Sequence, residues 1–268
     1  MYENIVNNII EIAVIAGQKV LEVYNSGETR YINKSNNTPL TIADTLSNKI
    51  IIENLGRIKI DSQNLPIISE EETGIPYEER KVIKKYWLVD PLDGTKEFIS
   101  RNGEFTINIA LIENSYPVLG VIYLPVDDVI YYGINNIGSY KKCDGETRKI
   151  TVKKVGSDLT VVQSRSHSGK EEEKFYSNFE IKKKTSAGSS LKFCHVAEGK
   201  ADLYYRSGPT MEWDTGAGQA IVENAGGFVF SNGQRMAYNK ASLKNNSFIV
   251  SSFKHRLFYE KNSSLASK

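Results

Sequence analysis

Two aspartates that lie three residues apart, Asp90 and Asp93, carry the clearest chemistry in this chain of 268 residues. The apolar residues 86–89 before them predict a buried strand, and Pro91 is expected to end that strand in a turn. Both carboxylates could then face one point, with the carbonyl of Leu92 turned inward between them. Because carboxylate and carbonyl oxygens are ligands of hard cations such as Mg²⁺, the turn predicts a divalent-cation site. The alternative is a common Asp-Pro turn followed by a surface Asp-Gly corner.

Gly94 and Thr95 come directly after these aspartates. If a helical turn begins there, their backbone N–H groups are available to bind an anion. Cation ligands and anion donors on one loop indicate a site for a metal-bound phosphate group.

Two acidic residues earlier in the chain are candidates for the same site. Glu70 opens an acidic run, residues 70–72, which as a solvated surface would need no function. Adjacent residues of an extended chain face opposite sides, so Glu70 and Glu71 cannot both point inward. Asp44 lies at the predicted start of a helix, where the favourable position for an acid is an adequate explanation by itself.

Asp214 is the last acidic candidate, and it is expected to open a helix. A role as the N-cap residue, worth about 1 kcal/mol, would account for it. However, Gly216 and Gly218 follow in the first turns, where each glycine costs about 1 kcal/mol of helix propensity. Such glycines indicate a close approach of backbone or ligand, and the cap and ligand roles are compatible.

The elements that must position these groups follow from the hydrophobic spacing. The first half of the chain predicts helices over residues 5–23 and from residue 41 to a stop at Gly56. It also predicts strands over residues 65–69, 86–89, 105–112, 118–124 and 129–132. We therefore expect helices packed on a sheet that is rich in antiparallel pairs.

The second half of the chain alternates between strands and helices. Strands are predicted over residues 159–163, 201–205, 228–230 and 248–250, and helices over residues 171–179, 189–198 and 215–224. This alternation predicts a second layered unit. We divide the chain into residues 1–155, with most of the candidate ligands, and residues 156–268, with Asp214. The charge run Lys182 to Lys184 is interpreted as a solvated face.

Composition narrows the possible functions. The chain has 34 Lys and Arg and 32 Asp and Glu residues, a formal charge of +2, so a wholly electrostatic nucleic-acid binder is disfavoured. Cys143 and Cys194 are far apart, which argues against a disulfide framework or a thiolate zinc site and favours a reduced compartment. No apolar run reaches the about 18 residues of a membrane span, and the N-terminal segment reads as an amphipathic helix.

The acidic motifs taken together resemble those of the inositol monophosphatase superfamily of Mg²⁺-dependent, Li⁺-sensitive phosphatases. Residues 70–71, 90–95 and 213–218 agree with that family in order and spacing, over nearly the whole chain. The resemblance implies an α/β fold, an alternating α-β-α-β-α sandwich with mixed sheets and two packed halves. A narrower resemblance, to the 3'(2'),5'-bisphosphate nucleotidases of the bacterial CysQ type, is carried by residues 38–44, 94–98, 164–167, 188–194 and 208–210.

The resemblance implies two or three Mg²⁺ ions and inhibition by Li⁺. The residues that it implies as metal ligands are Glu70, Asp90, Asp93, Asp214 and, through its carbonyl, Leu92. Glu70, Asp90 and the Leu92 carbonyl would hold one ion, and the three aspartates a second, with any third ion near Glu70. Asp44 and Thr95 would orient the attacking water. The implied catalytic residues are therefore Asp44, Glu70 and Thr95.

The resemblance also implies a nucleotide site. The residues implied in substrate binding are Glu70, Asp93, Gly94, Thr95, His167, Ser189, Lys192, Arg206 and Asp214. Of these, the Gly94 and Thr95 amides would bind the transferred phosphate. Taken without the family, Lys192 on a helix is more simply a solvated lysine, and His167 an ordinary loop histidine. Cys194 reads as a small buried apolar residue.

The implied activity is hydrolysis of the 3'-phosphate of 3'-phosphoadenosine 5'-phosphate (PAP) to AMP and phosphate by an activated water, without a phosphoenzyme. An inositol monophosphatase or another sugar-phosphate phosphatase is the nearest alternative, because it would share the metal site. A non-catalytic sensor of PAP and Mg²⁺ is a second, and a nuclease for very short oligonucleotides a third. We expect a small-molecule partner, no nucleic acid, no integral membrane span, a monomer or homodimer, and a cytoplasmic location, with peripheral binding to the inner membrane as an option.

Overall fold

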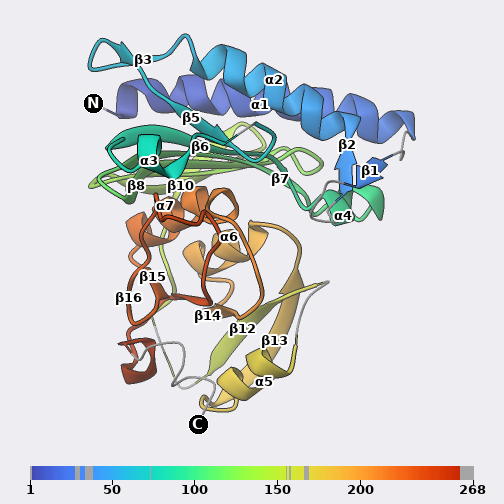
Figure 1. Ribbon diagram of the computed structural model, residues 1–268. Helices are drawn as coiled ribbons and strands as arrows, with labels where there is room; N and C mark the ends of the chain where they lie inside the picture. The colour runs from blue at the N-terminus through green and yellow to red at the C-terminus, as the bar shows by residue number, and fades with distance from the viewer. Residues whose placement is uncertain are drawn as a thin grey trace.

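The computed structural model describes residues 2–27, 31–33, 39–72, 74–154, 156, 158–165 and 169–259. Its main elements stack as alternating layers of helices and sheets (Figure 1). Helices α1 (Glu3–Ser26) and α2 (Ile42–Leu55) cover the first sheet, and α6 (Leu191–Ala197) and α7 (Gly216–Asn224) lie between the two sheets. Helix α5 (Lys170–Tyr176) packs on the second sheet. The predicted α-β-α-β-α sandwich is confirmed.

The first sheet is antiparallel except where β5 pairs with β6. Its strands in spatial order are β11 (Glu146–Ile150), β10 (Gly138–Cys143), β9 (Val129–Ile134), β8 (Tyr116–Leu124), β7 (Thr106–Glu113), β6 (Lys85–Asp93) and β5 (Ile67–Ser69). The sequence did not predict β10 and β11, because their residues are mostly polar and lack the apolar alternation of a half-buried strand.

The second sheet is mixed, because β12 pairs in parallel with β13 and β14 and the other pairs are antiparallel. Its strands in spatial order are β13 (Ile181–Ala187), β12 (Leu159–Ser164), β14 (Leu203–Arg206), β17 (Phe248–Ser251), β15 (Phe228–Ser231) and β16 (Gln234–Arg235). The charge run Lys182 to Lys184 is exposed, as predicted, but it lies in the edge strand β13. Lysines on an edge strand hinder pairing with another chain.

Short elements complete the described structure. They are β1 (Tyr31–Asn33), β2 (Pro39–Thr41), β3 (Lys59–Ile60), β4 (Gln63–Asn64), α3 (Tyr77–Arg80), α4 (Thr95–Ile99) and the 3-10 helices η1 (Glu212–Asp214) and η2 (Arg256–Tyr259). Among the helices of the described ranges, we find none with the length and apolar character to cross a membrane.

The proposed division at residue 155 falls in the connection between β11 and β12, so each large sheet comes from one side of it. The two sheets nevertheless share a core. One apolar cluster contains Leu88 and Ile122 from the first sheet together with Val162 and Val250 from the second. The halves are therefore segments of chain packed on common helices, and the division stays a proposal.

Helix α7 lies unusually close to its neighbours. A Cβ added to Gly120 of β8 would lie 2.4 Å from the carbonyl oxygen of Ala217, so the helix backbone rests directly on the strand. A Cβ added to Gly218 would lie 2.4 Å from the ring of Phe193 on α6. The close approach that the glycines of α7 predicted is therefore an approach of the helix to the backbone of β8 and to the side chain of Phe193. It fixes the start of α7, just after Asp214, against both α6 and the first sheet.

Candidate active site

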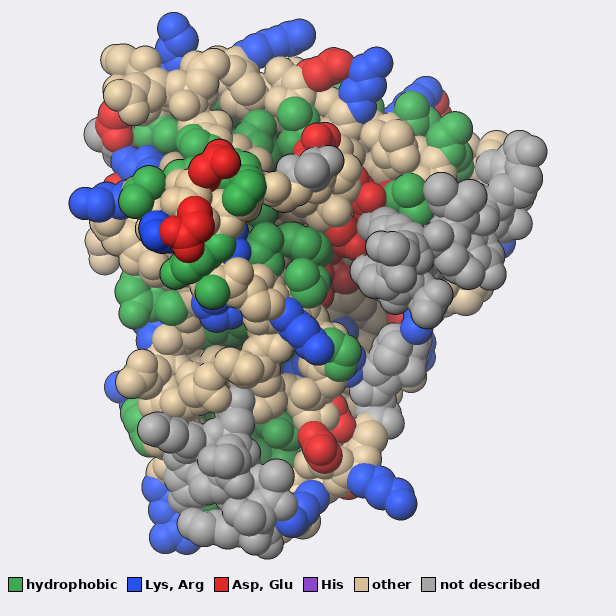
Figure 2. All heavy atoms as spheres, in the orientation of Figure 1, with side chains coloured by type: hydrophobic (Ala, Val, Ile, Leu, Met, Phe, Trp, Pro, Cys, Tyr) green, Lys and Arg blue, Asp and Glu red, His purple; other side chains and the backbone are tan. Residues whose placement is uncertain are grey.

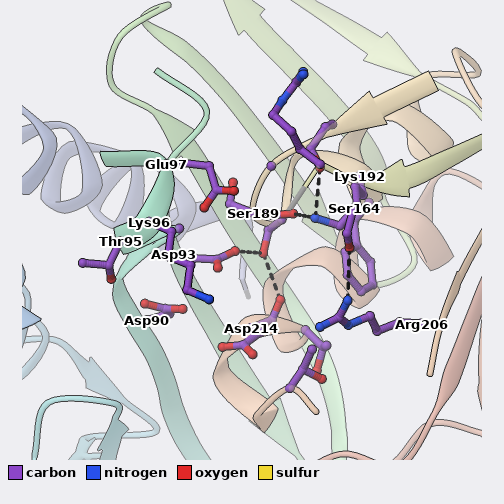
Figure 3. Close-up of a pocket in the computed structure, with 18 of the residues that line it drawn as sticks. Asp90, Asp93, Thr95, Lys96, Glu97, Ser164, Ser189, Lys192, Arg206 and Asp214 are labelled. Carbon is purple, nitrogen blue, oxygen red and sulfur yellow. Dashed lines mark hydrogen bonds between the residues drawn. The ribbon is translucent and has the colours of Figure 1, made fainter. Parts of the chain in front are cut away.

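Three carboxylates from distant parts of the chain meet at one end of the first sheet. Glu70 follows β5, Asp90 lies on β6, and Asp214 ends η1. One oxygen from each lies within 4.8 Å of the others. We call these residues the acidic cluster. Figure 3 shows Asp90, Asp93 and Asp214 pointing toward a common space. Carboxylate oxygens at this spacing could bind a divalent metal ion such as Mg²⁺.

The local structure of β6 differs from the sequence prediction. The strand does not end at Asp90 but continues through Pro91 to Asp93. Asp90 pairs with Asn108 and Asp93 pairs with Thr106, so two residues of β6 oppose one of β7. Such a bulge absorbs Pro91, which cannot donate a ladder hydrogen bond, and turns neighbouring side chains to new directions.

Backbone groups hold the bulge and the acidic cluster in place. The N–H of Leu92 donates to Asp90 Oδ1 at 3.1 Å, and the carbonyl of Pro91 accepts from Ser47 Oγ at 2.6 Å. The N–H of Met211 donates to Asp214 Oδ2 at 2.8 Å. Asp214 therefore caps the turn of η1 rather than α7, so the predicted N-cap role for α7 is wrong. The carboxylate of Asp214 still contributes an oxygen to the acidic cluster.

Ser190, which the sequence analysis did not single out, joins the two halves of the site. Its hydroxyl lies 2.7 Å from Asp93 Oδ2 and 2.9 Å from the carbonyl oxygen of Asp214, and it accepts from Asn108 Nδ2 at 2.8 Å. Asn108 itself lies 3.4 Å from Asp93 Oδ2. Ser190 precedes α6 and is buried. The one available signal was its place beside Ser189 in the segment 188–194.

The carboxylates perturb one another. Burial, followed by the negative charges of Glu70, Asp93 and Asp214, raises the pKa of Asp90 well above its usual range. Burial and the charges of Asp93 and Glu70 likewise raise the pKa of Asp214. Burial also raises the pKa of Asp93, although Lys192 opposes it. Carboxylates that are buried together in spite of their mutual repulsion are typical of a site that binds a cation.

Asp44 lies beside the acidic cluster and has two structural tasks. Its Oδ2 accepts from the N–H and hydroxyl of Thr41 at 2.8 and 2.6 Å, which caps α2 as the sequence allowed. Its Oδ1 accepts from the hydroxyl of Thr95 at 3.2 Å, and that hydroxyl also lies 3.5 Å from the Leu92 carbonyl oxygen. A helical turn, α4, does begin at Thr95 after Gly94, whose φ is 90°.

Two buried cations face the site from the other half of the chain. Lys192 is 7% exposed, and its ammonium donates to the carbonyl oxygens of Ala187 and Ser189 at 3.3 and 2.5 Å. Burial, opposed by Asp93 and Glu97, lowers the pKa of Lys192 to about 8. The reading of Lys192 as a solvated lysine is therefore wrong, because α6 lies between the two sheets.

Arg206 and Ser189 complete the cationic side. Arg206 on β14 is buried, and its Nη1 lies 3.4 Å from the hydroxyl of Ser164. Ser189 adopts a φ of 38°, and its buried hydroxyl makes no hydrogen bond to the described part of the chain. His167 lies outside the described residues. Cys194 is fully buried, consistent with an apolar packing role.

One cavity of about 370 Å³ brings these groups together. Its lining includes every predicted metal-ligand and substrate-binding residue that the structure describes. Asp44 does not line the cavity, but it accepts a hydrogen bond from Thr95, which does. Figure 2 shows the hollow near the centre of the view, with acidic side chains on its upper side and Lys and Arg side chains below. The cavity is therefore bipolar, with an acidic end on the first sheet and a cationic end on β14 and α6.

The chain is similar to known proteins over most of its length. The model of the inositol monophosphatase family matches residues 1–266. The 3'(2'),5'-bisphosphate nucleotidase CysQ of Salmonella typhimurium is 45% identical over 222 residues, 82% of this chain and 88% of that protein. The protein of that name from Escherichia coli K12 is 41% identical over 248 residues, 91% of this chain and 98% of its own.

Solved structures agree with this similarity. CysQ from Bacteroides thetaiotaomicron, a bacterial member of the inositol monophosphatase family, superposes with a TM-score of 0.79 at 38% identity, covering 91% of this chain and 96% of its own. An IMPase from Thermotoga maritima has a TM-score of 0.75 at 21% identity, covering 93% of this chain and 92% of its own. This second likeness concerns the fold alone.

Proposed function

The chain belongs to the inositol monophosphatase family, and we propose that it is a Mg²⁺-dependent 3'(2'),5'-bisphosphate nucleotidase that hydrolyses the 3'-phosphate of PAP. The observation that carries this proposal is the bipolar cavity. A metal-bound phosphate fits its acidic end, and a second phosphate fits the cationic end beside Lys192 and Arg206. Inositol monophosphate has no second phosphate to use those two buried cations.

The metal ligands are assigned from the family resemblance, and the acidic cluster supports the assignment. Glu70, Asp90 and the carbonyl of Leu92 would hold one Mg²⁺, and Asp90, Asp93 and Asp214 a second, with any third ion near Glu70. When bound, Mg²⁺ supplies the charge that keeps these carboxylates ionised and brings the pKa of a water molecule toward neutrality. Inhibition by Li⁺ is expected from the family.

The chain's own residues position the water and the phosphate. Because the hydroxyl of Thr95 gives its proton to Asp44 Oδ1, the Thr95 oxygen is left as an acceptor for a water molecule. Asp44 is itself fixed by Thr41, so the direction of that acceptor is set by the start of α2. The N–H groups of Gly94 and Thr95 would bind the equatorial phosphate oxygens. No side-chain nucleophile is needed, so no phosphoenzyme forms.

The cationic end would bind the rest of the nucleotide. The ammonium of Lys192 has three N–H groups, two of which point to the carbonyl oxygens of Ala187 and Ser189. The third is available to the 5'-phosphate. The hydroxyl of Ser189, the guanidinium of Arg206 and His167 would add further contacts. A monomer or homodimer and a cytoplasmic location stay predictions.

Phosphate release from a substrate panel tests the proposed function. The panel is PAP, its sulfated precursor 3'-phosphoadenosine 5'-phosphosulfate, adenosine 3'-monophosphate and inositol 1-phosphate, each with Mg²⁺, with chelator, and with Mg²⁺ plus Li⁺. We expect the highest kcat/KM for PAP, no turnover without Mg²⁺, and inhibition by Li⁺. A preference for inositol 1-phosphate would assign the chain to the monophosphatases instead. Tight binding of PAP without phosphate release would indicate a sensor.

A further inference from the structure

An ion pair between the two halves of the chain joins Glu104 to Arg165, and Arg165 lines the cavity. Glu104 lies between α4 and β7, and Arg165 directly follows β12. Arg165 donates from Nε to Glu104 Oε2 at 2.7 Å and from Nη2 to Glu104 Oε1 at 2.6 Å. Its backbone N–H donates to the carbonyl of Ala187 at 3.2 Å, which continues the pairing of β12 with β13. Both the backbone and the side chain of Arg165 are therefore fixed.

The same carboxylate also holds the segment that leads into α6. The N–H of Gly188 donates to Glu104 Oε2 at 2.7 Å. A Cβ at Gly188 would lie 2.8 Å from the carbonyl oxygen of Glu104, so the two segments are in direct contact. Ser189 and Lys192 follow within this segment and its helix. Glu104 thus fixes Arg165 relative to the segment 188–192, which contains the buried Lys192.

This arrangement leaves one edge of the guanidinium available. Nε and Nη2 of Arg165 bind Glu104, and Nη2 also lies 3.3 Å from the carbonyl oxygen of Ser186. Nη1 has no hydrogen-bond partner within the described ranges of the chain, and the Arg165 side chain is 45% exposed. Arg165 lines the same cavity as Lys192 and Arg206. A guanidinium fixed on one edge offers planar donors to a phosphate oxygen on the other.

We propose that Arg165 is a specificity-determining residue that binds the non-transferred phosphate of the substrate, and that Glu104 is its positioning residue. The inference rests on the proposed function, because it assigns the 5'-phosphate to this side of the cavity. An ordinary surface ion pair would contribute little to stability or binding. This pair differs because Arg165 lines the cavity and because the Glu104 carboxylate also accepts from the backbone N–H of Gly188.

Two variants separate direct binding from a structural tie. Arg165→Met removes the guanidinium but leaves Glu104 free to accept from Gly188. Glu104→Gln keeps the shape and weakens both contacts. Lys182→Met is the matched control, because it removes one positive charge from the same half at an exposed pair with Asp158. The assays compare PAP, with two phosphates, and adenosine 3'-monophosphate, with one.

In steady-state kinetics on the full chain, Arg165→Met is expected to raise KM for PAP by about 10- to 100-fold with kcat within about twofold. KM for adenosine 3'-monophosphate should change by less than about threefold. Glu104→Gln should show a smaller shift in the same direction, and Lys182→Met none. An equal rise of KM for both substrates would show that Arg165 only holds the local structure in place. An unchanged KM for PAP would exclude a contact between Arg165 and the 5'-phosphate.

Calorimetric binding in chelator makes the test independent of turnover. Wild type should bind PAP more tightly than adenosine 3'-monophosphate, and Arg165→Met should remove most of that difference. If wild type releases no phosphate from PAP, the proposed function fails, while these binding ratios still decide the role of Arg165. Equal affinity of wild type and Arg165→Met for PAP would overturn the inference.

Discussion

The two ends of the cavity differ in how their charges are held. At the acidic end, short side chains are anchored by backbone N–H groups, as Leu92 anchors Asp90 and Met211 anchors Asp214. At the cationic end, Lys192 and Arg206 reach the cavity on long side chains from α6 and β14. Short anchors fix oxygen positions closely, which metal coordination requires. Under the proposed function, the long side chains would set which anionic group is accepted next to that centre.

At both ends, the charges of the buried side chains are only partly balanced by opposite charges of the chain itself. The aspartates of the acidic end have raised pKa values because of burial and mutual repulsion, and burial lowers the pKa of Lys192. A cation at one end and an anion at the other would each relieve this strain. A substrate with two phosphates joins the two requirements in one molecule. The comparison predicts that changes at the acidic end affect kcat, and changes at the cationic end affect KM.

Asp90→Asn should have the largest effect, because Asp90 is the residue shared by both predicted metal sites. We expect kcat at saturating Mg²⁺ to fall by about 1,000-fold or more, roughly 4 kcal/mol of transition-state stabilisation. The fold should persist, since loss of one charge reduces the repulsion in the cluster. Turnover and thermal unfolding of the same preparation check both points. Near-wild-type turnover would refute the assignment of the acidic end.

Ser190→Ala should have the next largest effect, because its hydroxyl links Asp93 to the Asp214 segment. Loss of a buried hydrogen bond to a charged group costs about 1.5–3 kcal/mol, so kcat should fall by roughly 10- to 100-fold. The matched control is Ser252→Ala, since that buried hydroxyl has no hydrogen-bond partner in the described structure. Equal effects of the two substitutions on kcat would show that Ser190 has no special role.

The pH dependence of KM sharpens the contrast at the cationic end. With a pKa of about 8, Lys192 is mostly protonated at pH 7 and mostly neutral at pH 9. Because the charged form binds phosphate, KM for PAP should rise roughly tenfold over this interval. Lys192→Met should start from a higher KM and lose this rise, whereas Lys184→Met, on the exposed edge of β13, should keep it. The same pH profile in Lys192→Met would exclude Lys192 as the titrating group.

The sequence predicted the acidic end better than the cationic end, for physical reasons. Asp90 and Asp93 follow an apolar run at short spacing, so their convergence depends on local structure. The burial of Lys192 depends on α6 being enclosed by both sheets, which no local pattern contains. Similarly, the bulge at Pro91 exists because β7 pairs across it. Ser190 bonds to Asp93 and Asp214, which are distant in the sequence, so only the tertiary structure identifies it.

The smallest predicted effect is on stability, and it concerns the acidic end without metal. A carboxyl group whose pKa is raised in the folded protein stabilises the fold at low pH, and that stabilisation is lost as the pH rises through the folded-state pKa. Since Asp90 and Asp214 both have raised pKa values, the metal-free protein should lose stability as the pH rises above the usual carboxyl range. Mg²⁺ should therefore raise Tm by more at pH 8 than at pH 5, by a few degrees.

Asp90→Asn provides the internal comparison for this experiment. It removes one of the repelling charges, so in chelator its Tm should fall less steeply with pH than that of wild type, and its response to Mg²⁺ should be weaker. Asp158→Asn, at an exposed pair with Lys182, should leave both the slope and the Mg²⁺ response unchanged. Parallel Tm curves for wild type and Asp90→Asn in chelator would mean that the cluster does not repel itself. The electrostatic difference between the two ends of the cavity would then have no basis.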